Sequence, residues 1–430
     1  MLTRLNLTGI HPKRLSEELP RPIQLEDDTE SVVSSIINDV KLNGDSALRA
    51  YAEKFDGGAP ESFLVSEEDV EEAIMNCSQD LKSALSDAAL RIRTFHKSQI
   101  REKKNFELDG ISVQTIHQPV LRAGCYVPGG RAAYPSTLLM TAIPAMVAGV
   151  EEVIVCAPPN KSGRIDQATL VAARIAGVSN IYMVGGAQAI AAMAYGTKSI
   201  DPVDVIVGPG NVYVATAKKL VSGDVGIAAA FAGPSEIVVV ADDTVDPKLA
   251  AIDLIVQAEH GPGGMSWLIS WSDEVIESIL NEVSILAEES PRLEDIRSTF
   301  ETGGYAVLVD GPEQAMDVSN YVAPEHLQLM LEEPSQCLKK IRNAGAVFVG
   351  EMSPAVVGDY VAGPSHVLPT DSTARFASAL TVDDFLKDIH IVEMDQEALT
   401  GVADTITTIA EAESLNAHAL SVRLRIEGEK

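Results

Sequence analysis

The stretch AGCYVPGGRAAYPSTLLMTAIPAMVAG (residues 123–149) decides the fold of this chain, because the pattern that it begins is repeated. A short run of β-forming residues ends in a glycine-rich turn, and a helical run follows it. Three similar pairs come next, EEVIVCAPP with DQATLVAARIAG, NIYMVGG with AQAIAAMAYG, and DVIVGPG with NVYVATAKKLV, and EIVVVAD (236–242) ends the series. Nearly continuous apolar strands that alternate with helices predict a parallel sheet covered on both faces. The predicted fold class is α/β, with a doubly wound, Rossmann-like domain.

The segments on either side of this region have different patterns of predicted secondary structure. Residues 1–120 predict mostly helices, including one over 28–44 and one that starts with the capping-box spacing of Ser66 and Asp69. The pattern after Asp242 is mixed α/β, and the end of the chain predicts helices. With 430 residues the chain is too long for one compact core, so two or more domains are expected.

Composition excludes several classes of function. Asp and Glu outnumber Lys and Arg by 62 to 33, which gives a formal net charge of −29. Nucleic-acid binding depends on cationic patches, so no nucleic-acid partner is expected. An anionic ligand would need local cations or a metal to reverse the field. No apolar run approaches the ~20 residues of a membrane helix and no signal peptide is present, so we expect a soluble cytoplasmic protein without a membrane partner.

Three glycine-rich turns are candidates for a nucleotide site: YVPGGRAAYP, VGGAQAI and VGPGNVYV. They follow predicted strands, and ligands of open α/β sheets bind beyond the carboxyl ends of strands. None is a complete dinucleotide fingerprint, because Tyr213 occupies the place of the third glycine in the last turn. From the pattern alone, nucleotide binding and tight packing of the turns both stay open.

Two Glu-His pairs are candidates for chemistry. In QAEHGP, at the end of a helix capped by Asp246, Gln257 and His260 are three residues apart and could offer an amide oxygen and an imidazole nitrogen to one cation. In APEHLQL, Glu325 and His326 follow a proline and point apart, which suits proton transfer better than joint metal binding. A helix end contacting water and a solvated Glu beside an interfacial His are the alternatives.

Two further segments extend this inventory. GDYVAGPSHVLPT carries Asp359 and His366 in a loop-like context, and AEAESLNAHALSV carries Glu413 and His418 near a helix junction. The four cysteines are scattered, so a metal would need His, carboxylate or amide ligands. The residues alone indicate a metal-assisted enzyme, with nucleotide dependence left open.

Eight segments in this order resemble the histidinol dehydrogenase family: YVPGGRAAYPSTLLMTAIPA, VGGAQAIAAMAYGT, VGPGNVYVATAKKLV, AGPSEIVVVAD, QAEHGP, APEHLQL, GDYVAGPSHVLPT and AEAESLNAHA. The resemblance runs from about residue 25 to the end. It implies an oxidoreductase that uses NAD and one Zn²⁺ per subunit and takes L-histidinol through L-histidinaldehyde to L-histidine, the last steps of histidine biosynthesis. It also implies two Rossmann-like domains, one inserted in the other, and a homodimer whose terminal helical segments mediate dimerisation.

The resemblance also implies roles for individual residues. It gives four zinc ligands, which also contact the substrate: Gln257, His260, Asp359 and His418, the last from the other subunit. His326 would be the general base and also contact the substrate, while Glu325 would activate the water that forms the aldehyde hydrate. The remaining substrate contacts would be Ser235, His366 and Glu413. The NAD contacts would be Tyr126, Gln188 and Asn211.

The expected domains follow from the same resemblance. They are an N-terminal dimer-contacting segment (1–24), a discontinuous first α/β domain with the metal and catalytic residues (25–122 and 236–378), an inserted NAD-binding domain (123–235), and a C-terminal helical segment that reaches the partner's active site (379–430).

Some features depart from the family or allow another chemistry. Ser414 replaces a common glycine. Cys125 beside Tyr126 invites a thiohemiacetal mechanism, but a structural role as a small hydrophobe is commoner. The alternatives are a paralogous dehydrogenase acting on another polar alcohol, such as a sulfonated diol, a zinc hydrolase, and a non-catalytic dimeric binding protein. The intact Glu413 and His418 favour histidinol.

Overall fold

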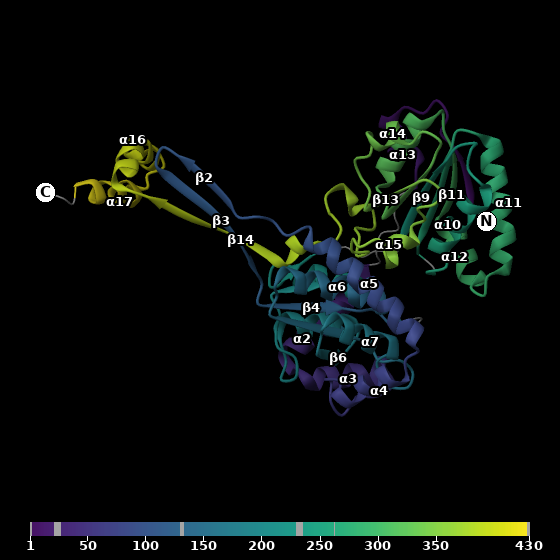
Figure 1. Cartoon of the computed structure of the whole chain (residues 1–430), viewed down its shortest axis with the longest axis horizontal. Coiled ribbons are helices and arrows are strands. Elements are labelled where there is room, and N and C mark those ends of the chain that lie inside the picture. Colours follow the sequence, from purple (N-terminus) through teal and green to yellow (C-terminus); the bar gives the residue numbers. More distant parts are fainter. Residues whose placement is uncertain (1, 21–26, 130–132, 229–234, 262, 428–430) are drawn as a thin grey trace. The chain divides into compact units, whose positions relative to one another are not determined.

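The computed structural model describes residues 2–20, 27–129, 133–228, 235–261 and 263–427. The chain forms two compact units, which we describe separately (Figure 1). The first unit comprises Met1–Gln99 with Leu121–Phe385, and the second comprises Ile100–Val120 with Leu386–Lys430.

The first unit contains a six-stranded sheet in which all neighbouring strands are parallel. Its order is β1 (Thr3–Asn6), β11 (Gly304–Leu308), β10 (Met265–Ser270), β9 (Glu236–Ala241), β12 (His326–Met330) and β13 (Ala346–Val349). Alternate residues of β9 face opposite cores, as the two-residue period of a strand requires. Ile237 and Val239 pack with helices α10 (Pro247–Ala258), α11 (Asp273–Glu289) and α12 (Leu293–Gly303). Val238 and Val240 pack with α13 (Pro312–Val322).

A second sheet of five parallel strands forms the other half of this unit. Its order is β6 (Asn180–Met183), β5 (Glu152–Ala157), β4 (Arg122–Tyr126), β7 (Val205–Val207) and β8 (Gly226–Ile227). The connecting helices are α6 (Pro135–Ala148), α7 (Gln167–Ala176), α8 (Gly186–Tyr195) and α9 (Val212–Val221). The four strand–helix pairs read from residues 123–221 are therefore confirmed, and the fold class is α/β. The last run of the series, EIVVVAD (236–242), does not join this sheet, because it forms β9 of the first sheet.

The helices before this sheet belong to it and not to the first sheet. They are α2 (Asp27–Asn43), α3 (Asp45–Phe55), α4 (Glu67–Asn76) and α5 (Gln79–Lys97). Val33 and Ile36 of α2 share a core with Ile154 of β5 and Ile190 of α8. The predicted boundaries grouped residues 25–122 with 236–378 instead. Periodicity shows that these helices have an apolar face, but it does not show which of two sheets covers that face.

The segment before α2 begins with a strand of the first sheet. β1 pairs in parallel with β11, and Leu7, Leu15 and Leu19 are buried in the core beneath it. The role of residues 1–24 in dimer contact stays a prediction.

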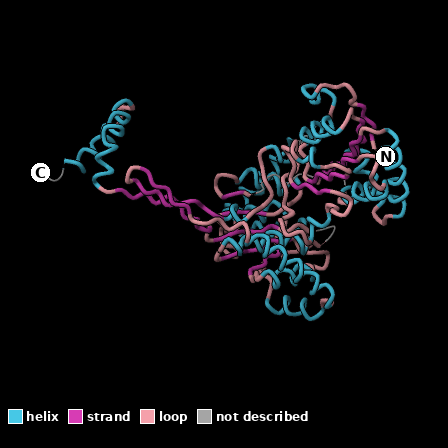
Figure 2. Tube along the Cα trace, turned by 45° about the horizontal axis from the view of Figure 1, so that its top comes forward, coloured by secondary structure: helices cyan, strands magenta, loops and turns pink. Residues whose placement is uncertain are grey.

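The second unit is an antiparallel sheet followed by two helices (Figure 2). The strands are β2 (Lys104–Leu108), β3 (Ile111–Pro119) and β14 (Leu386–Met394), and the helices are α16 (Gln396–Ala412) and α17 (Asn416–Glu427). Asp109 and Gly110 join β2 to β3 with φ values of 50° and 77°, as a two-residue hairpin turn requires. The expectation that residues 1–120 are mostly helical is confirmed, with β1, β2 and β3 as its strands. The expectation of a helical 379–430 segment was wrong in part, because this segment includes the strand β14.

Predicted helix starts are confirmed where a cap was identified. The Ser66 Oγ accepts a hydrogen bond from the Asp69 backbone N–H at 3.1 Å, at the start of α4. Asp246 accepts from the backbone N–H of Lys248 at 2.9 Å, at the start of α10. Among the described residues, none of the helices combines the length and the apolar character that crossing a membrane requires.

Candidate active site

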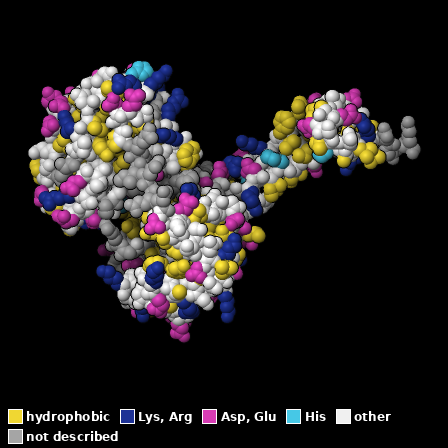
Figure 3. Space-filling view, turned by 180° about the vertical axis from the view of Figure 1, so that it is seen from behind, with side chains coloured by type: hydrophobic (Ala, Val, Ile, Leu, Met, Phe, Trp, Pro, Cys, Tyr) yellow, Lys and Arg dark blue, Asp and Glu magenta, His cyan; other side chains and the backbone are white. Residues whose placement is uncertain are grey.

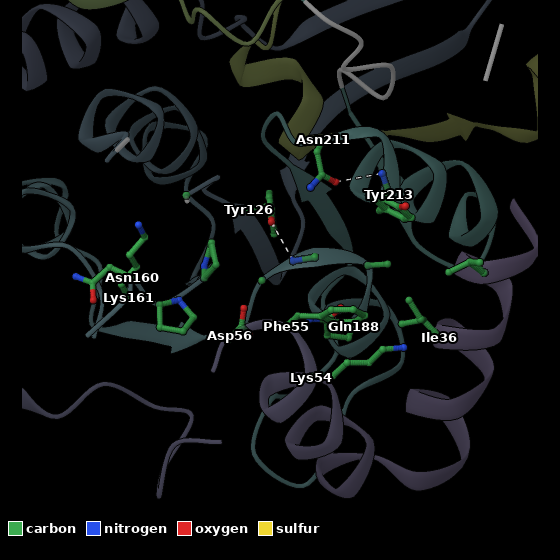
Figure 4. Close-up of a pocket in the computed structure, with 17 residues that line it drawn as sticks. Ile36, Lys54, Phe55, Asp56, Tyr126, Asn160, Lys161, Gln188, Asn211 and Tyr213 are labelled. Carbon is green, nitrogen blue, oxygen red and sulfur yellow. Dashed lines mark hydrogen bonds between the residues drawn. The ribbon is translucent and has the colours of Figure 1, made fainter. Parts of the chain in front are cut away.

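The three predicted NAD contacts line one cavity of about 630 Å³ at the carboxyl ends of the second sheet (Figure 4). Tyr126 ends β4, Gln188 lies in the first turn of α8, and Asn211 caps α9. The glycine-rich turns identified in the sequence therefore meet in one place, as expected for the carboxyl ends of parallel strands. We call this cavity the strand-end cavity.

Two of these three side chains, Tyr126 and Asn211, are held by hydrogen bonds to the backbone. Tyr126 is buried, and its hydroxyl accepts a hydrogen bond of 3.0 Å from the Gly186 N–H; burial raises the pKa of this phenol to about 12. Asn211 Oδ1 accepts from the backbone N–H groups of Tyr213 and Val214, at 3.1 and 3.2 Å. Its Nδ2 is thus the atom left to donate to a ligand. Tyr213 lines the cavity from the position where the fingerprint would have its third glycine.

Sequence reasoning missed part of the lining of this cavity. Lys54, Phe55 and Asp56, at the end of α3, and Lys161, in the loop after β5, also line it (Figure 4). The predicted boundaries placed Lys54, Phe55 and Asp56 in the other domain, whereas Lys161 lies in a loop without a motif that indicates a site. The two lysines matter in a chain of net charge −29, because an anionic ligand needs local cations.

The predicted catalytic pair lies at the amino ends of strands in the first sheet. Helix α13 ends at Val322, Ala323 adopts φ 53° and ψ 59°, and after Pro324 the strand β12 starts at His326. This turn presents Glu325 beside the start of β9, where the Glu236 N–H donates to Glu325 Oε2 at 3.2 Å. The predicted presentation from a turn and a strand start is confirmed.

The imidazole of His326 lies between two carboxylates. Its Nδ1 is 3.7 Å from Glu325 Oε2, and its Nε2 is 3.9 Å from Asp359 Oδ1. Burial lowers the pKa of His326 to about 4, although the Glu236 backbone acts in the opposite direction. The ring is therefore neutral at pH 7. Nδ1 makes no hydrogen bond of normal geometry with the described residues, so a nitrogen is available to accept a proton.

Glu325 lies among groups that oppose its ionisation. Burial raises its pKa to about 8, and the charge of Asp359 raises it further, while the Glu236 N–H and Ser235 act in the opposite direction. The interaction with Ser235 brings this predicted substrate contact into the same site.

Glu236 is a second buried carboxyl beside Glu325, and sequence reasoning did not identify it. Its pKa is raised well above the usual value, first by burial and then by the charge of Glu325. The signal was present in the sequence, because an acid at the first position of a buried apolar strand needs a reason to be there.

His366 differs from His326 in that both of its ring nitrogens are engaged. Its Nε2 lies 3.0 Å from the Thr137 Oγ1, and its Nδ1 lies 3.0 Å from the backbone oxygen of Asp359. Asp359 lies on α15 (Val356–Tyr360), and burial raises the pKa of its carboxyl to about 6. We call Glu325, His326, Asp359 and His366 the histidine–carboxylate cluster.

Gln257 and His260 lie at the end of α10. Gln257 is buried in the last turn of the helix, and its Nε2 has no hydrogen-bond partner among the described residues. His260 lies just beyond the last helical residue, Ala258, with its N–H 3.4 Å from the Gln257 carbonyl oxygen. Burial is the main cause that lowers the pKa of both His326 and His366, and the charge of His260 lowers both further, so His260 lies beside the histidine–carboxylate cluster.

The donors in the first unit fit a metal with nitrogen and oxygen ligands. Gln257 offers a buried amide whose oxygen can bind a cation, and the desolvated carboxyl of Asp359 would be stabilised by a cation. The first unit contains three of the predicted ligands, and two of them, His260 and Asp359, have a His, Cys, Asp or Glu side chain. Accordingly, no three side chains of those four types come together around a metal-sized space in the described ranges.

Glu413 and His418 lie in the second unit, both with exposed side chains. Glu413 follows the end of α16, and His418 lies in the first turn of α17, so the predicted helix junction is confirmed. Between them Ser414 has a φ of 61°, a left-handed conformation that glycine adopts at no steric cost.

Comparisons with known proteins agree on one family. The family model of histidinol dehydrogenase matches residues 19–426. Histidinol dehydrogenase of Methanocaldococcus jannaschii is 46% identical over 397 residues, which cover 92% of each chain. That of Carboxydothermus hydrogenoformans is 45% identical over 423 residues, 98% of this chain and 99% of the relative. The crystal structure of histidinol dehydrogenase from Elizabethkingia anophelis aligns with a TM-score of 0.94 at 35% identity, covering 99% of this chain and 98% of that chain. The chain belongs to the histidinol dehydrogenase family.

Proposed function

We propose that this protein oxidises L-histidinol through L-histidinaldehyde to L-histidine, in two successive NAD-dependent steps that end histidine biosynthesis. The single observation that carries the proposal is the family match over residues 19–426, because relatives named histidinol dehydrogenase match over almost their full lengths. The alternatives of a dehydrogenase for another polar alcohol and of a zinc hydrolase are not favoured.

The strand-end cavity is the proposed NAD site, with Tyr126, Gln188 and Asn211 as contacts. The β4–α6 connection supports a link between this cavity and the histidine–carboxylate cluster. Helix α6 follows β4 in the chain, and Thr137 in its first turn has its Oγ1 3.0 Å from the Nε2 of His366. When bound, NAD⁺ accepts the hydride in each oxidation, and Zn²⁺ orients the imidazole and amino groups of the substrate.

His326 is the proposed general base. In the first oxidation its free ring nitrogen takes the proton of the substrate hydroxyl, and in the second it takes the proton of the aldehyde hydrate. The neutral state of the ring and the absence of a hydrogen bond at Nδ1 among the described residues support this role. The neighbouring carboxylate of Asp359 stabilises the imidazolium that forms, and Glu325 does so once it is ionised.

Glu325 is the proposed group that activates the water which adds to the aldehyde. A carboxyl with a pKa of about 8 is a stronger base than an ordinary glutamate once it is ionised. Ser235, His366 and Glu413 would contact the substrate, and Gln257, His260, Asp359 and His418 would hold both zinc and substrate.

A covalent thiohemiacetal on Cys125 is not supported. Its side chain is fully buried, and burial raises the pKa of the thiol to about 12. A protonated thiol away from the surface is a poor nucleophile. All four cysteines are free thiols, which supports the proposed cytoplasmic location.

A homodimer with shared active sites completes the proposal. No residue of the strands β2, β3 and β14 is buried, and apolar side chains such as Phe106, Leu108 and Leu424 are exposed in the second unit (Figure 3). An isolated three-stranded sheet with both faces open is marginally stable, so a cover is expected. A second copy of the chain would provide it and bring His418 to the partner's Gln257, His260 and Asp359.

The decisive assay for the activity is NADH formation from L-histidinol, with a chelator and with zinc added back. We expect activity to be lost with the chelator and restored with zinc; no NADH from metal-replete protein would refute the function.

Sharing of sites is tested by mixing His260→Ala and His418→Ala subunits. Statistical reassembly of two inactive homodimers should recover about a quarter of the wild-type activity, because each mixed dimer has one intact site. If each site is built from one chain, mixing recovers nothing.

A further inference from the structure

A fully buried lysine lies behind the strand-end cavity, and the proposed function gives it no role. Lys218 is in α9 and is 0% exposed, which places it among the largest completely buried side chains of the protein. A lysine is almost never fully buried unless its ammonium group is paired, because leaving water is costly for a charge. Its position therefore requires an explanation.

The ammonium group of Lys218 donates a hydrogen bond to the carbonyl oxygen of Gly208. Gly208 is the first residue of the turn from β7 to α9, and this turn ends at Asn211. A Cβ atom on Gly208 would lie 2.1 Å from the carbonyl oxygen of Tyr126, at a φ of 106°. Lys218 therefore fixes the turn from one side while the Tyr126 backbone confines it from another.

The charge of Lys218 is not neutralised by an acid. Among the described residues, no carboxylate forms an ion pair with it, and burial lowers the pKa of the ammonium to about 8. The titratable group that interacts with it is the thiol of Cys125, which is uncharged at neutral pH. Lys218 is therefore mainly protonated at pH 7, and its positive charge is directed along the turn toward Gly208.

We propose that Lys218 is a positioning residue for the dinucleotide. It holds the Gly208 carbonyl so that the β7–α9 turn presents Asn211 to the strand-end cavity, and it adds a buried positive charge behind a site for a dianionic pyrophosphate. This inference rests on the proposed binding of NAD in that cavity. In a chain with a net charge of −29, such a cation offsets the repulsion of an anionic cofactor.

The test is the variant Lys218→Met, which keeps the length of the side chain and removes the charge and the donor. NAD⁺ binding to the metal-replete dimer is measured by calorimetry, and KM is measured for NAD⁺ and for L-histidinol. We expect the Kd and the KM for NAD⁺ to rise about tenfold, as for the loss of one charged hydrogen bond. The KM for L-histidinol and the zinc content should stay within about twofold.

Lys219→Met is the matched control. Lys219 is next to Lys218 on α9, but its side chain is exposed and pairs with Glu30 at 3.4 Å. It should leave NAD⁺ affinity unchanged. Gly208→Ala is the second variant, because an added methyl group must displace the same turn without changing any charge. It should also raise the Kd for NAD⁺ by about tenfold or more.

Three outcomes would overturn the inference. The first is an unchanged Kd for NAD⁺ in Lys218→Met. The second is a rise of both KM values in that variant together with a loss of zinc. The third is an equal rise of the Kd for NAD⁺ in Lys219→Met. Failure of the proposed function is a separate result. In that case the wild-type protein would form no NADH from L-histidinol, while calorimetry with NAD⁺ would still report on Lys218.

Discussion

Replacing His326 with asparagine tests the centre of the proposed mechanism. A positioned general base contributes roughly 10²- to 10⁴-fold to a rate. The value for this site should lie in the lower half of that range, because burial lowers the pKa of His326 to about 4, below the optimum for a base working near pH 7. We therefore expect kcat to fall about 10²- to 10³-fold, which corresponds to roughly 3–4 kcal/mol of barrier.

The assay is NADH formation at saturating NAD⁺, with L-histidinol and L-histidinaldehyde as separate substrates. Both rates should fall, because the same nitrogen takes a proton in each oxidation. Zinc content should be unchanged, since His326 is not among the proposed ligands. His366→Asn is the matched control: that ring is half-buried and desolvation also lowers its pKa to about 4, but both of its nitrogens are engaged. We expect it to raise the KM for L-histidinol more than it lowers kcat.

Two results would refute this reasoning. If His326→Asn loses its zinc, the residue serves the metal and its assignment as a base is wrong. If kcat for both substrates stays within about threefold of wild type, another group takes the proton.

Three further predictions concern residues in other parts of the chain. Ser414→Gly should stabilise the protein by about 0.5–1 kcal/mol, because a serine at φ 61° is strained; a lower melting temperature would contradict this. Gln257→Leu should lower zinc affinity at least about tenfold by metal analysis, since the oxygen of its buried amide is the proposed ligand; full zinc occupancy under competition by a chelator would exclude that role. Burial lowers the pKa of His96 below 6.5, so below that pH the unfolded chain binds a proton that the folded chain excludes. The contribution of the neutral His96 ring to stability is therefore present above pH 6.5 and lost as the pH falls. His96→Gln should therefore flatten the pH dependence of urea unfolding by at most about 1.4 kcal/mol per pH unit below pH 6.5, and identical slopes would refute it.

Much of the second sheet could be predicted because its determinants are local. Apolar strands, glycine turns and helices follow one another between residues 123 and 221, and each signal lies within a few residues of the element that it specifies. The packing partner of α2 could not be predicted in this way. Val33 and Ile36 meet Ile190 more than 150 residues later, and nothing in the helix itself distinguishes that surface from the first sheet.

The candidate site shows the same limit. The turns of the strand-end cavity obey the rule that ligands bind at the carboxyl ends of strands. Glu325 and His326 lie at the opposite end of their sheet, and the general rule gives no reason to look there. The motif identified these two residues, but only the pairing of β12 with β9 brings Glu325 beside the backbone of Glu236. The hairpin at Asp109–Gly110 was predictable, since that dipeptide is a strong hairpin signal.

The turn before Glu325 and His326 has a consequence for engineering. Ala323 has a φ of 53° with no glycine to relieve it, and the proline after it narrows its choices further. A non-glycine residue held in this region costs about 1–3 kcal/mol, so the rest of the fold stabilises a conformation that the local sequence resists. Selection for heat resistance alone would favour glycine at position 323. That substitution would make the turn that holds Glu325 and His326 more flexible. Stability and turnover number should therefore diverge among variants of this turn, and a library ranked only by melting temperature would discard its best catalysts.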